Sequence, residues 1–140
     1  MEYTVKMAKG LENNTDASLV RRIVFIHEQG FENEFDEIDK DAVHCVLYLG
    51  GFPVGTGRIF DENGKAHIGR IAVQKDYRGK GNGTKIINVL EKYAKEKGYK
   101  ECVLSAQLSA QGFDEKLGYK PQGEMYFEEY CKHILMVKEL

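Results

Sequence analysis

Hydrophobic and polar positions alternate along much of the chain, and elsewhere hydrophobic positions recur at helical spacing. Alternation is typical of strands, and a recurrence every three or four residues is typical of helices. Alternating or continuous apolar runs predict strands at residues 3–7, 44–49, 54–60, 66–73, 101–106, 119–125 and 134–137. Helical spacing predicts three helices: a first that Asn14 or Thr15 can cap, a second at 83–97 and a short third at 110–117. The apolar stripe of the first is Leu19, Ile23 and Ile26 with Val20, Val24 and His27 beside it, and Arg21 and Arg22 fall outside this stripe, on an expected solvated face. The stripe of the second is Ile86, Leu90, Tyr93 and Ala94 with Ile87 adjacent.

The turns between these segments predict how the strands pair. Residues 50–53 and the Asn63-Gly64 pair separate three successive strands, which indicates an antiparallel meander. The helix at 83–97 then joins two strands by a crossover connection, and such a connection gives a parallel pair. The prediction is an α/β (α+β) fold with a mixed, mostly antiparallel sheet flanked by helices, in a single domain of residues 1–140.

The loop that precedes the helix at 83–97 is rich in glycine and in cationic side chains. The first N–H groups of a helix have no intrahelical partner, so this loop can direct several donors at one anion. Gly79, Gly81 and Gly83 carry no Cβ atom that would hold a phosphate away from the backbone. Their spacing is not that of a P-loop or of the dinucleotide fingerprint Gly-x-Gly-x-x-Gly. The loop predicts a pyrophosphate site.

The same loop matches the signature Arg/Gln-x-x-Gly-x-Gly/Ala through Arg78, Gly81 and Gly83, and here the chain resembles the GNAT superfamily of N-acetyltransferases. Residues 113–119 are similar to the Phe-Tyr-x-x-x-Gly-Phe segment of that family. Residues 22–29 resemble the Arg-x-x-Val-Phe-x-x-Glu-Gln stretch of its small bacterial ElaA-like members. The resemblance implies a fold in which two parallel strands splay apart and hold CoA in the gap.

The resemblance also implies a reaction and the residues that bind its donor. A neutral amine of a small-molecule acceptor attacks the thioester of acetyl-CoA directly, so acetyl-CoA is a co-substrate. The pyrophosphate would be held by Arg78, Gly79, Lys80, Gly81, Asn82, Gly83 and Thr84. The pantetheine arm and the rest of CoA would be contacted by the backbone of Ile71, Ala72 and Val73 and by Gln107, Ala110 and Phe113.

The group that protonates the departing thiolate is not evident from the sequence. Many members of the family place Tyr directly after the position of Phe113, whereas this chain has Asp114. An ionised carboxylate would repel the thiolate unless it turned outward or held a proton. Tyr119, Tyr126 and Tyr130 are alternative donors from nearby turns. A second interpretation is therefore a catalytically weak protein that binds acyl-CoA as a sensor or interaction module.

The candidates for the general base are Glu28, Asp36 and His133. His133 has a side chain of suitable ordinary pKa, and it begins a His-x-x-Met ending that resembles the ElaA-like proteins. Asp36 belongs to an acidic segment at 28–41, which is either a solvated loop or an acceptor wall that attracts a cationic amine. Arg22 is likewise either a solvated side chain or, by the resemblance, a substrate-binding residue.

Composition narrows the classes of partner. The chain has 140 residues, of which 42% are hydrophobic and 30% charged, and its net charge of −2 supplies no basic field for nucleic acid or anionic membrane. No apolar run approaches the roughly 20 residues of a membrane span, and no signal-peptide pattern is evident, so we expect a cytoplasmic protein. Cys45, Cys102 and Cys131 form no Cys-x-x-Cys pair, so we expect neither a metal site nor a disulfide framework. A homodimer is expected only on general grounds.

Overall fold

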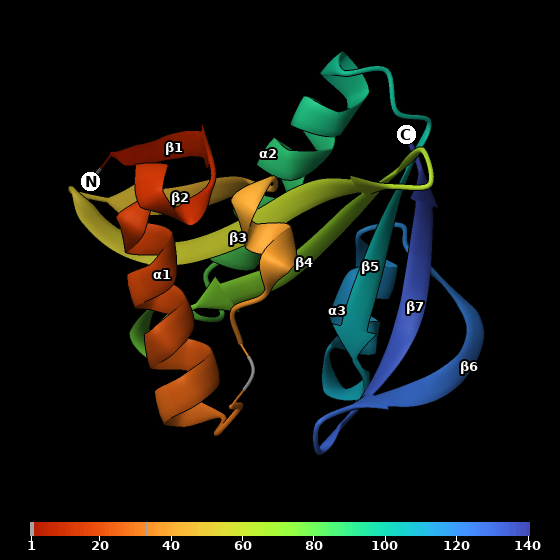
Figure 1. Ribbon diagram of the computed structural model, residues 1–140. Coiled ribbons are helices and arrows are strands. Elements are labelled where there is room, and N and C mark those ends of the chain that lie inside the picture. Colours follow the sequence, from red (N-terminus) through yellow and green to blue (C-terminus); the bar gives the residue numbers. More distant parts are fainter. Residues whose placement is uncertain (1, 33) are drawn as a thin grey trace.

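The computed structural model describes residues 2–32 and 34–140, which form a seven-stranded mixed sheet with helices on both faces (Figure 1). The sheet order is β1-β2-β3-β4-β5-β7-β6. The strands are β1 (Tyr3–Lys9), β2 (Val43–Leu49), β3 (Phe52–Glu62), β4 (Lys65–Val73), β5 (Glu101–Gln107), β6 (Lys120–Glu128) and β7 (Cys131–Glu139). The helices are α1 (Thr15–Arg21), which continues as the π-helical segment η2 (Arg22–Glu28), α2 (Asn82–Glu96) and α3 (Gln111–Lys116). Short 3₁₀ turns are η1 (Leu11–Asn13), η3 (Glu37–Lys40), η4 (Lys75–Tyr77) and η5 (Leu108–Ala110).

The predicted antiparallel meander is confirmed for β2, β3 and β4, and β1 extends it by pairing with β2. The two-residue turn between β3 and β4 has φ angles of 55° at Asn63 and 77° at Gly64, the left-handed geometry that an Asn-Gly pair favours. This half of the sheet ends at β4, which delivers the chain to the glycine-rich loop.

The parallel pair between β4 and β5 is short. Pairing runs only from Ala66 with Cys102 to Ile68 with Leu104, and the described residues form no further pair between these strands. Meanwhile β5 stays paired with β7 along its whole length, from Glu101 with Glu139 to Gln107 with His133. The carboxyl-terminal halves of β4 and β5 therefore diverge, as Figure 1 shows, and the predicted splayed parallel pair is confirmed.

A β-bulge in β4 lies where the divergence begins. Thr56 of β3 pairs with Ala72, but Arg58 pairs with Gly69, so Arg70 and Ile71 share one position on β3. Arg70 has a φ of 50°, which is uncommon for a residue with a side chain. Bulges increase the local twist and bend the strand that carries the extra residue. We infer that this bulge turns β4 away from β5.

Helix α2 covers one face of the sheet and anchors the loop before it. Ile86, Ile87, Leu90 and Ala94 are buried against β2, β3 and β4, as the predicted stripe required. The helix approaches β3 so closely that a Cβ atom on Gly57 would lie 2.9 Å from Ile86. Burial of such side chains contributes roughly 1.5–3 kcal/mol each to the free energy of folding. The glycine-rich loop therefore opens a firmly docked helix.

The opposite face is covered by α1 and η2, and here the buried stripe is shifted from the predicted one. Val20 and Val24 are buried with Ala72 of β4, whereas Leu19 is 44% exposed. Arg21, expected on the outside, is 1% exposed. The helix is rotated because Arg21 has buried carboxylate partners that its own local sequence does not reveal. In the described part of the chain, no helix is long and apolar enough to cross a membrane.

Candidate functional site

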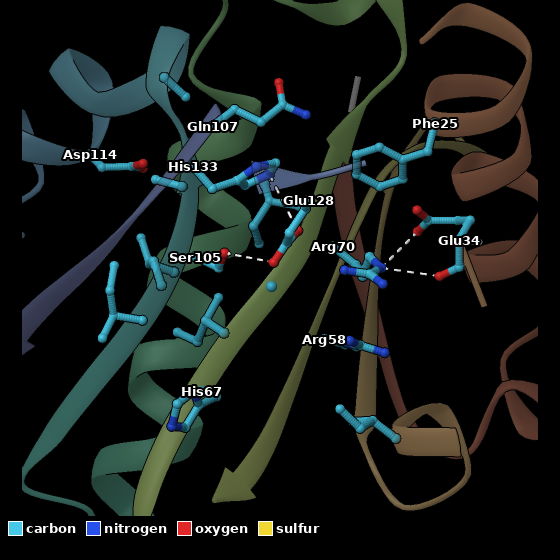
Figure 2. A pocket seen from close by; sticks show the side chains of 18 of the residues that line it. Phe25, Glu34, Arg58, His67, Arg70, Ser105, Gln107, Asp114, Glu128 and His133 are labelled. Carbon is cyan, nitrogen blue, oxygen red and sulfur yellow. Dashed lines mark hydrogen bonds and ion pairs between the residues drawn. The ribbon is translucent and has the colours of Figure 1, made fainter. Parts of the chain in front are cut away.

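A cavity of about 600 Å³ occupies the space between β4 and β5 beyond their last pair (Figure 2). Residues 69–71 of β4 form one wall, and residues 104–107 of β5 form the opposite wall. The lining also includes Phe113 and Asp114 of α3, Phe60 of β3 and His67 of β4. The predicted CoA contacts Ile71, Gln107, Ala110 and Phe113 all line this cavity.

The glycine-rich loop has the geometry of an anion-binding helix start. Gly81 occupies the position before α2 with a φ of 81°, and the first hydrogen bond of the helix runs from the Lys85 N–H to the Gly81 carbonyl, at 3.1 Å. The N–H groups of residues 82–84 precede that bond, so they have no partner within the helix. A Cβ atom on Gly83 would lie 3.4 Å from the ring of Phe113, which places this loop beside the aromatic side chain of the cavity.

Arg78 and Glu28, predicted for different roles, are bound to each other. The guanidinium of Arg78 donates two hydrogen bonds to the Glu28 carboxylate, at 2.6 and 2.7 Å, and its Nε donates to the Val73 carbonyl at 2.8 Å. The hydrogen bond from Arg78 lowers the pKa of Glu28, which makes that carboxylate a weaker base. Glu28 is also not among the described residues that line the cavity. The structure places it as a partner of the loop arginine.

The acidic segment at 28–41 combines exposed carboxylates, such as Glu32, Glu37 and Asp41, with two that are buried and paired. Glu34 and Asp39 are each 4% exposed and are bound by Arg21, which donates to Glu34 at 3.0 Å and to Asp39 at 2.7 Å. Arg58 of β3 bonds both Asp36 and Asp39, at 2.7 and 2.8 Å. Three arginines, Arg21, Arg58 and Arg70, thus face the carboxylates Glu34, Asp36 and Asp39 in one ion network.

The network favours the ionised form of Asp36 and Asp39, whereas burial raises the pKa of Glu34 in spite of its arginine contacts. Burial alone would raise the pKa of Asp39, but hydrogen bonds from Arg21, from the Asp36 N–H and from Arg58 outweigh it and lower the pKa to about 2. The hydrogen bond from Arg58 likewise lowers the pKa of Asp36 against the effect of burial. Asp36 lines the cavity, but both of its oxygens accept hydrogen bonds from Arg58. This carboxylate is therefore already neutralised by the protein.

Of the acid candidates from the sequence, Asp114 and Tyr126 line the cavity, whereas Tyr119 and Tyr130 do not belong to its described lining. Asp114 lines the cavity and is 6% exposed, and burial raises its pKa to about 6. Tyr119 is 1% exposed in the main core, where its hydroxyl donates to Glu91 of α2 at 2.6 Å. Burial and this carboxylate raise the pKa of Tyr119, and the residue does not belong to the described cavity lining. Asp114, unlike Tyr119, is therefore placed to meet a thioester in the cavity.

His133 lines the cavity, and Arg22 does not. His133 lies in β7 with its ring stacked on Tyr126 of β6 at a centroid distance of 6.0 Å. Arg22 is exposed, with its guanidinium 5.4 Å from the centre of the Phe35 ring, outside the described lining. The structure thus gives His133 access to a bound molecule and gives Arg22 none in this cavity.

Three contacts bridge the cavity from the segment after η2 to β5 and the β6–β7 hairpin. They are Gln107 Nε2 to Gln29 Oε1 at 2.9 Å, the stacked rings of Phe31 and Tyr130 at 5.2 Å, and the Glu32 N–H to the Glu129 carboxylate at 3.2 Å. We call these three contacts the bridge.

Sequence reasoning missed several residues of the site: Arg21, Glu34, Arg58, Arg70, Ser105 and Glu128. Arg58 carried a usable signal, since a cation inside an apolar strand that is expected to be half buried needs a partner. The roles of Ser105 and Glu128 had no such signal, because they depend on which strands become neighbours.

Comparison with known proteins places the chain in one family. Residues 14–140 match the acetyltransferase (GNAT) domain. The chain is 38% identical over 136 residues to the uncharacterized N-acetyltransferase YjcF of Bacillus subtilis, covering 95% of this chain and 97% of that protein. It is similar to the crystal structure of a Lactobacillus plantarum protein described as an N-acetyltransferase. The identity is 28% and the TM-score 0.91, with 100% of this chain and 99% of that chain covered. Escherichia coli ElaA shares the fold at 24% identity and a TM-score of 0.85, with 99% and 100% covered.

The ion network predicts that alanine substitutions at two adjacent arginines lower the free energy of unfolding by very different amounts. Arg21→Ala removes the cation that both buried carboxylates share, and breaking a buried ion pair in this way costs about 3–5 kcal/mol of unfolding free energy. Arg22→Ala removes an exposed guanidinium from the next position and should cost less than about 0.5 kcal/mol. Urea unfolding of both variants measures the difference, and a loss below about 1 kcal/mol for Arg21→Ala would contradict the network.

The raised pKa of Asp114 predicts that Asp114→Asn stabilises the protein by an amount that depends on pH. Because the folded-state pKa of about 6 lies above the ordinary value, the contribution of the protonated carboxyl to stability is present below about pH 4 and is lost as pH rises through 6. At neutral pH the variant should therefore be more stable than wild type by about 1–2 kcal/mol, below the full value because the carboxyl borders the open cavity. Thermal unfolding between acid and neutral pH tests this, with Glu115→Gln on the exposed side of α3 as control. Equal stabilities at neutral pH would show that the carboxyl is solvated.

Proposed function

The chain belongs to the GNAT acetyltransferase family, and we propose that it is an N-acetyltransferase that moves the acetyl group of acetyl-CoA to the amine of a small acceptor. The observation that carries the proposal is the early end of the β4–β5 pairing directly beside the anion-binding start of α2. One cavity thus adjoins both a site for the pyrophosphate and two strand walls for the extended arm of the cofactor.

The pyrophosphate would lie at the start of α2. There the unpaired N–H groups of residues 82–84 and the helix dipole favour negative charge, and Lys80 adds a cation. Arg78 would contact the phosphates from its place beside Glu28. The open space around Gly79 and Gly81, whose φ angles are 72° and 81°, leaves the backbone accessible to a bulky anion.

The pantetheine arm would follow β4 beyond its last pair with β5. Ala72 and Val73 pair with β3 on one edge, and among the described residues their other edge has no strand partner, while Ile71 of the bulge lines the cavity. An extended amide-containing chain can add to such an edge by main-chain hydrogen bonds. A backbone N–H aimed at the thioester oxygen would also stabilise the oxyanion of the tetrahedral intermediate. Gln107, Ala110 and Phe113 would enclose the arm from the side of β5 and α3.

Asp114 would supply the proton for the departing thiolate. Its pKa of about 6 leaves a fraction of the carboxyl protonated near neutral pH, so it can donate where an ordinary aspartate could not. The demand on this donor is modest, because a thiol with an ordinary pKa of about 8.5 is a fair leaving group. The cavity of about 600 Å³, part of which CoA would occupy, suits an acceptor of small-molecule dimensions.

Acetyl-CoA binding tests the proposed function. In a calorimetric titration, the wild type should bind acetyl-CoA with one-to-one stoichiometry, and Gly83→Glu should weaken binding at least about 100-fold by placing a carboxylate among the anion-binding N–H groups. Asn88→Glu makes the same change of charge on the exposed side of α2 and should leave the affinity within about twofold.

Absence of binding by a folded wild type would contradict the donor site. Binding without thiol release across a panel of primary amines would instead favour the sensor interpretation.

A further inference from the structure

Four polar side chains from three strands converge on the β5–β7 side of the cavity. They are Ser105 of β5, Tyr126 and Glu128 of β6, and His133 of β7. The Ser105 hydroxyl donates to Glu128 Oε1 at 3.1 Å and is also hydrogen-bonded to the Tyr126 hydroxyl. The other oxygen of Glu128, Oε2, faces His133 Nε2 at 3.4 Å, and Figure 2 shows both contacts at the cavity.

The backbone selects the tautomer of the His133 ring. Nδ1 lies 3.1 Å from the Cys131 carbonyl oxygen, which can only accept a hydrogen bond, so Nδ1 carries the proton. The neutral ring therefore presents the lone pair of Nε2 to the cavity side, opposite the Glu128 carboxylate. Two acceptors in this position are satisfied by a proton on the ring or by an N–H donor from a bound molecule.

Glu128 also differs from the carboxylates across the cavity. Glu34 and Asp36 are neutralised by the arginine network, whereas the described residues provide no Lys or Arg ion pair for Glu128. Its side chain is 41% accessible. It is thus a carboxylate with charge available for a cation that enters the cavity.

A second carboxylate and imidazole pair, Glu62 and His67, lies near the end of the cavity where β4 and β5 are still paired. His67 is the register partner of Val103, where β4 and β5 are still bonded to each other. His133 is the register partner of Gln107, the last residue of β5, where the strands have separated. The pair at the separated end is therefore the one beside the proposed path of the pantetheine arm.

We propose that Glu128 and His133 form the acceptor-ammonium site, in which Glu128 binds the ammonium group and His133 Nε2 removes its proton. This assignment rests on the proposed acyl transfer. The R–NH₃⁺ group gives one proton to Nε2, and its nitrogen lone pair then forms the C–N bond to the thioester carbonyl. The C–S bond breaks as the tetrahedral intermediate collapses. The nitrogen loses its second proton and the thiolate gains one, so the products are the amide and the thiol of CoA. The imidazolium returns its proton to solvent. The acceptor class is a primary ammonium compound.

Other ionisable groups share the surroundings of the imidazole. They are Tyr126 of β6, Glu129 of the hairpin, Cys131 of β7, Asp114 of α3 and Arg70 of β4. Of these, Asp114 has a pKa of about 6, and because the same carboxyl is present in wild type and in each variant, its titration affects both alike and cancels from their ratio.

The test compares thiol release from acetyl-CoA by wild type, His133→Gln and Glu128→Gln, with Nα-acetyl-lysine amide, spermidine and alanine amide as probe amines. At pH 7, His133→Gln should lower kcat/KM for the amine about 100-fold while the KM for acetyl-CoA stays within about twofold. This deficit should narrow toward about pH 10, because a growing fraction of the lysine-type amine is then already neutral. Glu128→Gln should raise the amine KM about tenfold. His27→Gln, the same change at an exposed histidine, is the control.

A deficit of His133→Gln that stays constant from neutral to alkaline pH would overturn the assignment, since loss of structure alone has no reason to be repaired by a neutral amine. An unchanged kcat/KM would also overturn it. If wild type turns over none of the probes, ¹⁵N spectra of the histidine rings decide. With CoA bound, spermidine should shift the His133 Nε2 resonance in wild type and not in Glu128→Gln, and the absence of a shift would overturn the proposal. Failure of wild type to bind acetyl-CoA would instead overturn the proposed function.

Discussion

The functional architecture depends on the point at which β4 and β5 stop pairing. Hydrogen bonding between parallel strands would normally continue along both chains, but here it ends after Ile68 and Leu104. The bulge at Arg70 bends β4 at that point, while β7 holds β5 straight along its full length. Because both strands are secured on their outer edges, their inner edges can remain open, and the cavity between them is a property of the sheet itself.

The arginine network holds the other side of this opening. Arg70 stands at the bulge and contacts Glu34, which Arg21 bonds from α1, so the network joins the helix to the strained position of β4. Buried ion pairs often add little net stability relative to apolar packing, although breaking one is costly. The network is therefore best understood as a positioning device. It also pairs Glu34 and Asp36 with arginine, whereas Glu128 has no Lys or Arg ion pair among the described residues.

Features with local causes could be predicted from the sequence, and features with distant causes could not. The Asn63-Gly64 turn, the helix before Gly98 and the glycine-rich loop each depend on residues a few positions apart, and their elements formed as expected. The buried face of α1 was misassigned because Arg21 finds its partners 13 and 18 residues further along the chain. Glu128 was missed because its position beside Ser105 requires β7 to lie between β5 and β6 in the sheet. The sequence therefore pointed to the proposed donor loop and to His133, whereas Glu128 could be found only from the fold.

The most direct test of this account is a crystal structure of the protein with acetyl-CoA bound. The account predicts the pyrophosphate on the N–H groups of residues 82–84, the pantetheine arm between residues 71–73 of β4 and 105–107 of β5, and the thioester on the side of the cavity that Glu128 and His133 line. Acetyl-CoA bound elsewhere on the protein, or β4 and β5 paired along their whole length in the complex, would contradict it.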